Sequence, residues 1–530
     1  ANKLKVTSRN AYWGSVSTTD YGNKTFYALW MQLTDYRAWC PEPTVSLTGD
    51  DVYVTGTYRE NGAIMAVNQL TLNATNLVPG STVRLSTPAN SGVYFTSTRG
   101  ANFTKATKPT ATIDITADAG GDITNQTIYV HYMPAAAATA GATAAPTDVT
   151  VRAEYQTNTT VYSTRDVHVR NMPAQFVIAT KVGGSWFALP ADMTTESNPA
   201  GVLLDVDETT WTARGPSTLA YTLWPVKTTN GSGDQYETAG DSLRFANSSD
   251  NKALWANNAS GGTNIKVDAA ISSLGKGADA QSCKWGVTTI VDGTTWKYNL
   301  QTNQSSNTRN LNYSSGKWGT YASGNNDLYL IPLTVVETAS ISVMEWGETE
   351  VALKCASGTT LTSVKIDGTE VSTPPTLTTL SGDIMRLTGL PNLSALGTYA
   401  MKKMVVSVNE SSTAKQFVTT IPFILTSSNS SADGTPKTAI ELRNFAAGSS
   451  QDARNAVIRV VDVVVRNGAQ LNVTTETGNA TACTFNDLYI YPGGKVDISG
   501  NNLGVQNVYL RGGFSWLELP NKNENNYRLP

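Results

Sequence analysis

The sequence predicts an all-β, multidomain protein, and three observations lead to this prediction. Short runs alternate apolar and polar residues, as in residues 52–58, which is the pattern of half-buried antiparallel strands. Almost no stretch places an apolar residue at every third or fourth position over a dozen residues, as an amphipathic helix requires. Three stretches near the end of the chain are copies of one another. At 530 residues the chain is too long for one core, so we expect about three to five domains.

Residues 1–65 are predicted to be an aromatic-rich β segment. It is either one more small β-domain or the closing part of a domain that starts upstream. No apolar stretch opens the sequence, so we expect any secretion signal to have been removed or to lie upstream. The aromatic residues of the segment 1–65 include Tyr12, Trp13, Tyr21, Phe26, Tyr27, Trp30, Tyr36 and Trp39.

Residues 66–172 and 334–426 are each predicted to form a β-sandwich. Short strands separated by Gly, Pro and Asn turns over about a hundred residues resemble an immunoglobulin-like sandwich. The Cys and Trp residues of antibody domains are missing, so the resemblance is one of architecture. We expect strands at 70–73, 82–86, 111–116, 126–132, 147–155 and 166–170 in the first sandwich, and at 339–344, 350–355, 363–368 and 417–425 in the second.

Residues 173–333 carry a loose internal repeat. Leu189, Leu254 and Leu311 each lie in a short similar stretch, and the two intervals between them are long enough to include loop insertions. Within residues 284–300, two strands are joined at an Asp-Gly turn, and an arginine and a short apolar strand follow. This order resembles β-trefoil carbohydrate-binding modules of the ricin-B type, although their Gln-x-Trp pattern is absent. The resemblance implies a β-trefoil-like domain.

Residues 427–530 are predicted to be a linker followed by rungs of a parallel β-helix. The three copies span 462–473, 487–498 and 507–516, and the spacing between their starts is that of one solenoid coil. Each copy has a short strand, then a glycine that can turn a corner. The alternative is three unrelated Gly-bounded strands of a sandwich. An uncapped solenoid exposes an apolar face, so we expect the protein to continue beyond residue 530 or to dock there on a partner.

Composition excludes several classes of partner. Only 15% of the residues are charged and the net charge is −3, so no basic surface is expected for nucleic acid or an anionic membrane. The longest apolar low-complexity run, 134–146, is too short to span a bilayer, and we expect no transmembrane segment. The cysteines are far apart, which predicts buried, isolated thiols rather than a disulfide framework. They are Cys40, Cys283, Cys355 and Cys483.

One acidic cluster is a candidate metal site. Asp205 and Asp207 lie on one side of a predicted strand and Glu208 follows them, so these carboxylates could bind Ca²⁺ or act as acid and base. The alternative is an exposed turn. No phosphate-binding loop, nucleophile elbow or zinc-protease motif occurs, so we expect a protein that is not an enzyme and needs no cofactor, with Ca²⁺ the one cofactor to consider.

Aromatic residues of the 173–333 region are candidates for glycan binding. Trp and Tyr rings stack on sugars, while Asn and Asp bond hydroxyl groups. The alternative is that these rings fill the domain core. The candidate residues form two groups, Trp255, Asn257 and Asn258, and Trp318, Tyr321, Asn325, Asn326 and Asp327.

The order of modules resembles large secreted or outer-surface proteins of Bacteroidota, in which immunoglobulin-like, lectin-like and β-helical modules follow one another. The resemblance covers most of residues 66–530 and implies an extracellular, cell-surface location on a Gram-negative bacterium. Ser242 also lies in an Asp-Ser-Leu triplet that resembles the O-glycosylation site of these bacteria.

Two functions are therefore expected. The first is a non-enzymatic modular surface protein, an adhesin or surface-layer component, that contacts glycans or other cell-surface proteins and could self-assemble. The second is the accessory, non-catalytic portion of a secreted polysaccharide-degrading enzyme.

Overall fold

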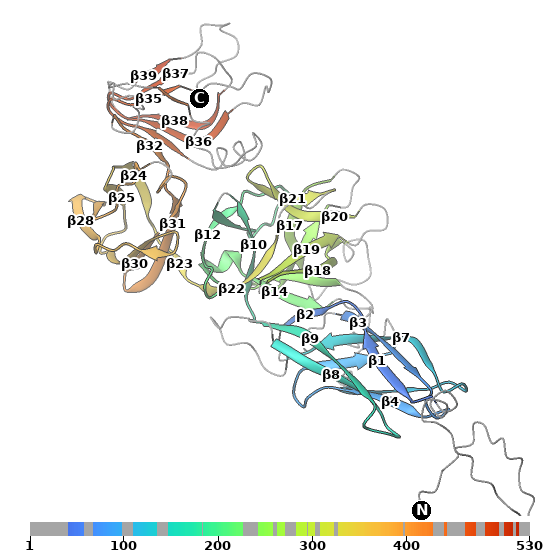
Figure 1. The fold of residues 1–530 in the computed structure, drawn as a ribbon. Coiled ribbons are helices and arrows are strands. Elements are labelled where there is room, and N and C mark those ends of the chain that lie inside the picture. The colour runs from blue at the N-terminus through green and yellow to red at the C-terminus, as the bar shows by residue number, and fades with distance from the viewer. Residues whose placement is uncertain are drawn as a thin grey trace, which may run out of the picture.

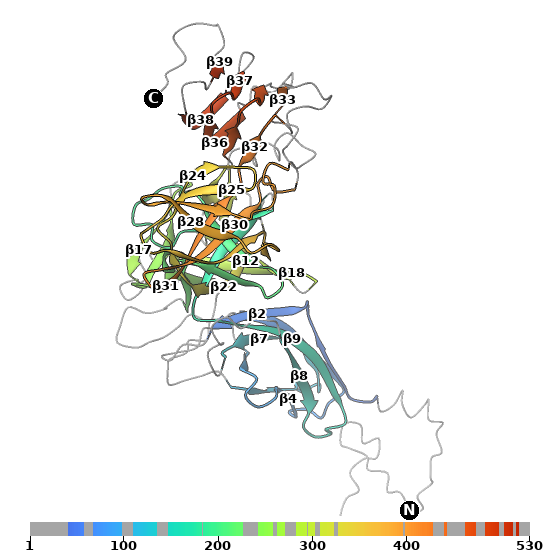
Figure 2. The same cartoon turned by 90° about the vertical axis from the view of Figure 1, so that its left-hand side faces the viewer.

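The chain is all-β and multidomain, which confirms the predicted class (Figure 1). Four groups of strands, called units here, follow one another from the N-terminal to the C-terminal side in Figure 1, and in Figure 2 the first group lies at one end and the fourth at the other. Among the described residues, no helix has both the length and the apolarity to cross a bilayer. The computed structural model describes residues 41–57, 67–97, 110–134, 147–182, 184–225, 242–257, 262–270, 282–293, 295–302, 308–322, 327–395, 398–427, 439–441, 462–472, 483–497, 503–511 and 516–518.

The first unit is a sandwich of two sheets. One sheet has the order β1 (Thr44–Thr48), β3 (Val67–Thr75), β7 (Ile123–Tyr132) and β5 (Val93–Thr96). The other has the order β2 (Val52–Thr57), β9 (Tyr162–Met172), β8 (Thr147–Tyr155), β4 (Thr82–Ser86) and β6 (Thr112–Thr116). Alternate residues enter the core between them, as Val52 and Val54 of β2 do. Because β1 pairs with β3 and β2 pairs with β9, the boundary predicted at residue 66 divides strands of one sandwich.

The second unit is a closed ring of strands with three hairpins. In the ring, each strand pairs with the next, and a bridge between Tyr298 and Leu328 completes it. The ring order is β10 (Phe176–Val182), β14 (Tyr221–Pro225), β15 (Ser242–Asn247), β18 (Trp285–Asp292), β19 (Thr295–Thr302) and β22 (Tyr329–Val335). The hairpins are β11 (Ser185–Ala188) with β12 (Val202–Asp207), β16 (Lys252–Ala256) with β17 (Ile265–Ala270), and β20 (Arg309–Ser314) with β21 (Lys317–Tyr321). A further strand, β13 (Thr212–Gly215), lies between β12 and β22.

The internal repeat of this unit corresponds to equivalent core positions. Leu189, Leu254 and Leu311, which mark the repeat in the sequence, are all buried in one apolar core. Each contributes to the same core from a different third of the unit, because a repeated supersecondary element places its apolar residues at equivalent sites.

The third unit is another two-sheet sandwich. One sheet has the order β23 (Glu337–Thr338), β31 (Thr413–Thr420), β30 (Lys403–Glu410), β26 (Thr360–Ile366) and β27 (Thr369–Glu370). The other has the order β24 (Ser342–Trp346), β25 (Glu350–Lys354), β29 (Ile384–Thr388) and β28 (Thr376–Ser381). The prediction of one continuous closing strand over residues 417–425 was wrong, because the structure has two strands there. Pro422 has no N–H to donate, and the chain leaves the sandwich there, so β31 ends and β32 (Phe423–Leu425) joins the fourth unit.

The fourth unit consists of two parallel sheets with one strand from each copy. The first sheet has the order β32, β34 (Val463–Val465), β36 (Cys483–Ile490) and β38 (Leu503–Leu510). The second has the order β33 (Ala439–Glu441), β35 (Gln470–Asn472), β37 (Lys495–Asp497) and β39 (Trp516–Glu518). Val463 lies opposite Leu488, and Leu488 lies opposite Val508. These three are the second residues of the three copies, so the strands pair in the register in which the copies align. The pair β32 and β33, which precedes the copies, was not predicted.

Close packing of successive copies makes Gly494 sensitive to substitution. A Cβ at this position would lie 2.6 Å from the backbone carbonyl oxygen of Val465 in the preceding copy. Because backbone cannot move aside as a side chain can, we expect Gly494→Ala to lower the free energy of unfolding of the fourth unit by about 2 kcal/mol in urea titrations.

The matched control is Gly286→Ala, whose added Cβ would meet its nearest neighbour at 3.7 Å, an ordinary contact. Its expected cost is below about 0.5 kcal/mol, as at other unconstrained positions. An equal loss of unfolding free energy in the two variants would show that successive copies do not pack as closely as the 2.6 Å approach at Gly494 implies.

The side chains of two of the four cysteines lie in the part of the chain that the structure describes. Cys283 and Cys355 are buried and form no disulfide, as the sequence predicts for isolated thiols. Burial, with a smaller contribution from the Glu410 carboxylate, raises the pKa of Cys355 to about 11. This thiol is therefore an unreactive core residue at neutral pH.

Candidate functional site

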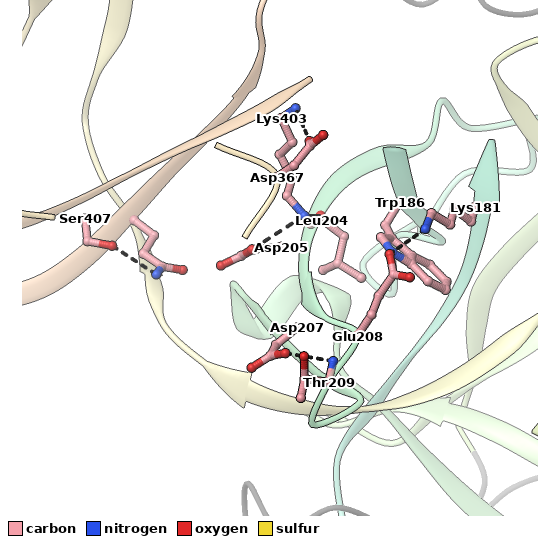
Figure 3. Close-up of polar contacts among 11 residues, drawn as sticks. Lys181, Trp186, Leu204, Asp205, Asp207, Glu208, Thr209, Asp367, Lys403 and Ser407 are labelled. Carbon is pink, nitrogen blue, oxygen red and sulfur yellow. Dashed lines mark hydrogen bonds and ion pairs between the residues drawn. The ribbon is translucent and has the colours of Figure 1, made fainter. Parts of the chain in front are cut away.

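The acidic cluster predicted to bind calcium lies at the junction between the second and third units (Figure 3). Asp205, on β12, forms an ion pair with Lys403 at the start of β30, with 3.5 Å between Oδ1 and Nζ. The same ammonium donates a hydrogen bond to the carbonyl oxygen of Leu204 at 3.0 Å. Lys403 is only 4% exposed and Asp205 only 7%. A buried charge pair from two different units therefore connects them.

The other two carboxylates of the cluster have separate partners. Asp207 Oδ1 accepts hydrogen bonds from the backbone N–H groups of Thr209 and Thr210. These residues form an exposed turn, which is the alternative to a metal site that the sequence left open. Glu208 accepts hydrogen bonds from Lys181 Nζ at 2.5 Å and from Trp186 Nε1 at 2.9 Å.

The predicted calcium site is therefore not assembled by these residues. An ammonium group occupies the position beside Asp205 that a cation would take, and Asp207 and Glu208 are held by other donors. The described part of the chain contains no group of three or more His, Cys, Asp and Glu residues that could hold a metal ion.

Burial dominates the electrostatics of the junction. Removal from water lowers the pKa of Lys403, although the neighbouring Asp205 carboxylate acts in the opposite direction. Burial of Glu208 alone would raise its pKa, but the hydrogen bonds from Lys181 and Trp186 lower it on balance. The charged form of Lys403 therefore depends on Asp205 for its stability in the folded protein.

The first predicted glycan-binding group lies partly at the surface. Trp255, on β16, is half-buried, and the Lys266 ammonium lies 5.0 Å from its ring centroid. The Asn257 side-chain amide donates a hydrogen bond to the Glu196 carboxylate. Asn258 lies outside the described residues. A half-exposed indole with an amide nearby keeps the chemistry that stacking on a sugar requires.

The second predicted group is not one surface. Trp318 is 0% exposed, and its indole N–H donates to the carbonyl oxygen of Ala188 at 3.0 Å, so it fills the core and cannot stack on a ligand. Tyr321 is half-buried, and the Asp327 carboxylate pairs with Lys297 at 2.9 Å. Asn325 and Asn326 lie outside the described residues. The prediction of binding by Trp318 was wrong, because its ring is fully buried in the apolar core of the second unit.

The candidate modification site is described only in its backbone. Ser242 is the first residue of β15, and β15 pairs with β14 and β18 in the ring.

The junction between the first and second units was not predicted from the sequence. The Tyr298 hydroxyl, from β19, lies 2.9 Å from Thr55 Oγ1 and accepts a hydrogen bond from Arg170 Nη1 at 2.9 Å. The Tyr53 ring stacks on His168, with centroids 4.7 Å apart, and contacts Trp296 edge-on. The only sequence signal was the apolar alternation of 52–58, which shows a strand but not its partner.

The third and fourth units also share side-chain contacts. Arg466 donates a hydrogen bond to the carbonyl oxygen of Trp346, and its guanidinium lies 4.9 Å from the centroid of the Tyr491 ring. Val464 and Tyr491 of the fourth unit are buried in the core of the third. Each of the three junctions is thus made by buried side chains from both sides.

Comparison with known proteins gives no close relative. No protein-family model and no curated protein matches the sequence. Solved structures with some likeness include invasin, a bacterial integrin-binding protein, at 10% identity and a TM-score of 0.15, covering 72% of this chain and 60% of that one. A structure of the eight N-terminal Ig domains of Down Syndrome Cell Adhesion Molecule has 9% identity and a TM-score of 0.13, covering 72% and 36%. The extracellular cadherin domains 1–4 of protocadherin gamma B7 have 8% identity and a TM-score of 0.15, covering 72% and 76%.

Proposed function

We propose that this chain is a non-enzymatic, extracellular modular surface protein, an adhesin or surface-layer component, in which β units in series act as a stiff spacer that presents contact surfaces. The observation that carries the proposal is the buried ion pair between Lys403 and Asp205, which belong to different units. Relative motion is the default for linked domains, and a buried charge pair opposes it because any separation would expose or unpair the charges.

The composition supports the proposed location. Thr, Ser, Asn and Gly dominate, and the charged fraction is 15%, a balance that the sequence shares with extracellular β proteins. We infer the outer surface of a Gram-negative bacterium from the resemblance of the module order to Bacteroidota surface proteins.

Two further assignments of modules belong to the proposal. We infer that the ring and three hairpins of the second unit are a β-trefoil, and that the parallel ladders of the fourth unit are turns of a β-helix. In this proposal the second unit contacts glycans, and Trp255 and Tyr321 are the predicted residues whose rings are only half-buried.

Small-angle X-ray scattering of the full chain, with negative-stain electron microscopy, tests the spacer role. We expect one elongated shape with a constant angle between the second and third units at both low and high salt, because buried pairs are screened little. Images in which that angle varies from molecule to molecule would contradict the proposal. Ordered arrays on the grid would favour a surface-layer component over an adhesin.

A further inference from the structure

The first and second units enclose a cavity of roughly 380 Å³, called the junction cavity here. In both views, β2 and β9 of the first unit lie beside the ring strands of the second (Figures 1 and 2). Domain interfaces and the mouths of β-barrels are the places where small-ligand sites occur most often, and roughly 300–1,000 Å³ is their usual size. The junction cavity lies at an interface between two units and falls within that range.

The two sides of the junction cavity differ in chemistry. The second unit supplies an apolar floor of buried residues, Leu223, Leu243 and Leu330. The first unit supplies a wall that includes the polar residues Asn68 and Gln69. Tyr129 of the first unit, and Val287, Thr288 and Thr289 on β18, also line the cavity.

The aromatic wall is held in place before any ligand enters. Tyr53 lines the cavity and is fixed between His168 and Trp296. Tyr298 also lines it, and its hydroxyl is engaged by Thr55 and Arg170. A wall that is already ordered avoids the entropy cost of ordering side chains on binding.

The charge of the lining favours a neutral ligand. Asp51 is the charged residue among those lining the cavity, and its carboxylate is 3.2 Å from the Arg165 guanidinium. Among the described residues that line the cavity, none has a cationic side chain to attract a phosphate, sulfate or uronate. Amides and hydroxyl groups above an apolar and aromatic surface match a sugar ring, which has apolar C–H faces and hydroxyl edges.

We propose that the junction cavity binds a neutral sugar, a terminal mono- or disaccharide of a glycan. This inference rests on the proposed function, since it names the ligand class of a surface protein that contacts glycans. It places the site at the junction of two units rather than at the predicted Trp255. Binding across the junction would also add to the contacts that hold the first two units together.

The test is an array of neutral and acidic oligosaccharides probed with the full chain and two variants. Thr289→Trp adds a large ring on the half-buried face of β18, where Val287 also lines the cavity, while Ile290→Trp adds the same ring on the opposite face of the strand, at a residue that is 49% exposed and does not line the cavity. We expect neutral glycans to bind, Thr289→Trp to raise the dissociation constant at least tenfold, and Ile290→Trp to change it less than twofold. Thermal unfolding of both variants confirms that they are folded.

The possible outcomes separate this inference from the proposed function. If neutral glycans bind and Trp255→Ala abolishes binding while Thr289→Trp does not, the glycan-contact role stands and the junction cavity is not the site. If no glycan on the array binds, or only acidic ones do, the inference is overturned, while the scattering and microscopy experiment still decides the spacer role.

Discussion

Replacing Lys403 with methionine is expected to destabilise the junction between the second and third units by about 3–5 kcal/mol, because the Asp205 carboxylate would stay buried without its counter-charge. Methionine has a similar length and keeps the packing of the aliphatic stem. The loss therefore reports the charge rather than a cavity. The carbonyl oxygen of Leu204 would also lose the donor that lies 3.0 Å from it.

Hydrogen exchange followed by mass spectrometry measures this effect on the peptides that contain β12 and β30. We expect both strands to exchange faster in Lys403→Met than in the unchanged chain. The neighbouring Lys402 provides a matched control, because its side chain is 38% exposed and lies 3.8 Å from Asp367. Lys402→Met should cost less than about 1 kcal/mol, as exposed pairs do.

A double variant distinguishes a lost pair from a lost lysine. In Lys403→Met with Asp205→Leu, both charges are gone and the junction is apolar, so stability should return close to that of the unchanged chain. If Lys403→Met behaved like Lys402→Met, the buried pair would not hold the two units together, and the spacer proposal would lose its main support.

Lowering the pH from 6.5 to 4 is expected to destabilise the first unit by about 3 kcal/mol through His131 alone. This side chain is 0% exposed on β7, and its Nε2 lies 2.9 Å from Thr96 Oγ1. Burial lowers the pKa of His131 to about 4 from the ordinary 6.5. Below pH 6.5 the unfolded chain binds a proton that the folded chain does not, and each pKa unit corresponds to about 1.4 kcal/mol.

The sign of this dependence is specific. Stability from neutral His131 is fully present above pH 6.5, falls as the pH approaches about 4, and changes no further below that value. Urea titrations at pH 7, 6 and 5, with hydrogen exchange of β7 peptides corrected for its intrinsic pH dependence, measure the slope. His131→Gln keeps a hydrogen-bonding side chain without a titrating group, so the slope should diminish in that variant. An unchanged slope would assign the acid sensitivity to other groups.

The repeats were the part of the fold that the sequence showed best. Val463, Leu488 and Val508 hold the same position in the three copies, and they face one another in the parallel ladder because stacked copies place equivalent apolar residues in contact. Leu189, Leu254 and Leu311 share one core for the same reason. A repeated contact leaves a repeated residue, which can be recognised without knowing the fold.

The candidate sites were predicted less well, because their residues act through distant partners. Nothing near Asp205 in the sequence shows that Lys403 will lie beside it, so an ion pair and a cation site have the same local pattern. Trp318 and Trp255 are both indoles next to polar residues, yet the first is enclosed by the core and the second is half-exposed.

The sequence by itself determined the all-β class, the sequence copies in the final unit and the low charge, since these depend on local alternation, spacing and composition. Only the tertiary structure decided that β1 and β2 complete the first sandwich, that Pro422 separates the third unit from the fourth, and that Lys403 neutralises Asp205. Pairing between strands and burial of charges depend on residues brought together across long stretches of chain, and local patterns do not specify which residues meet.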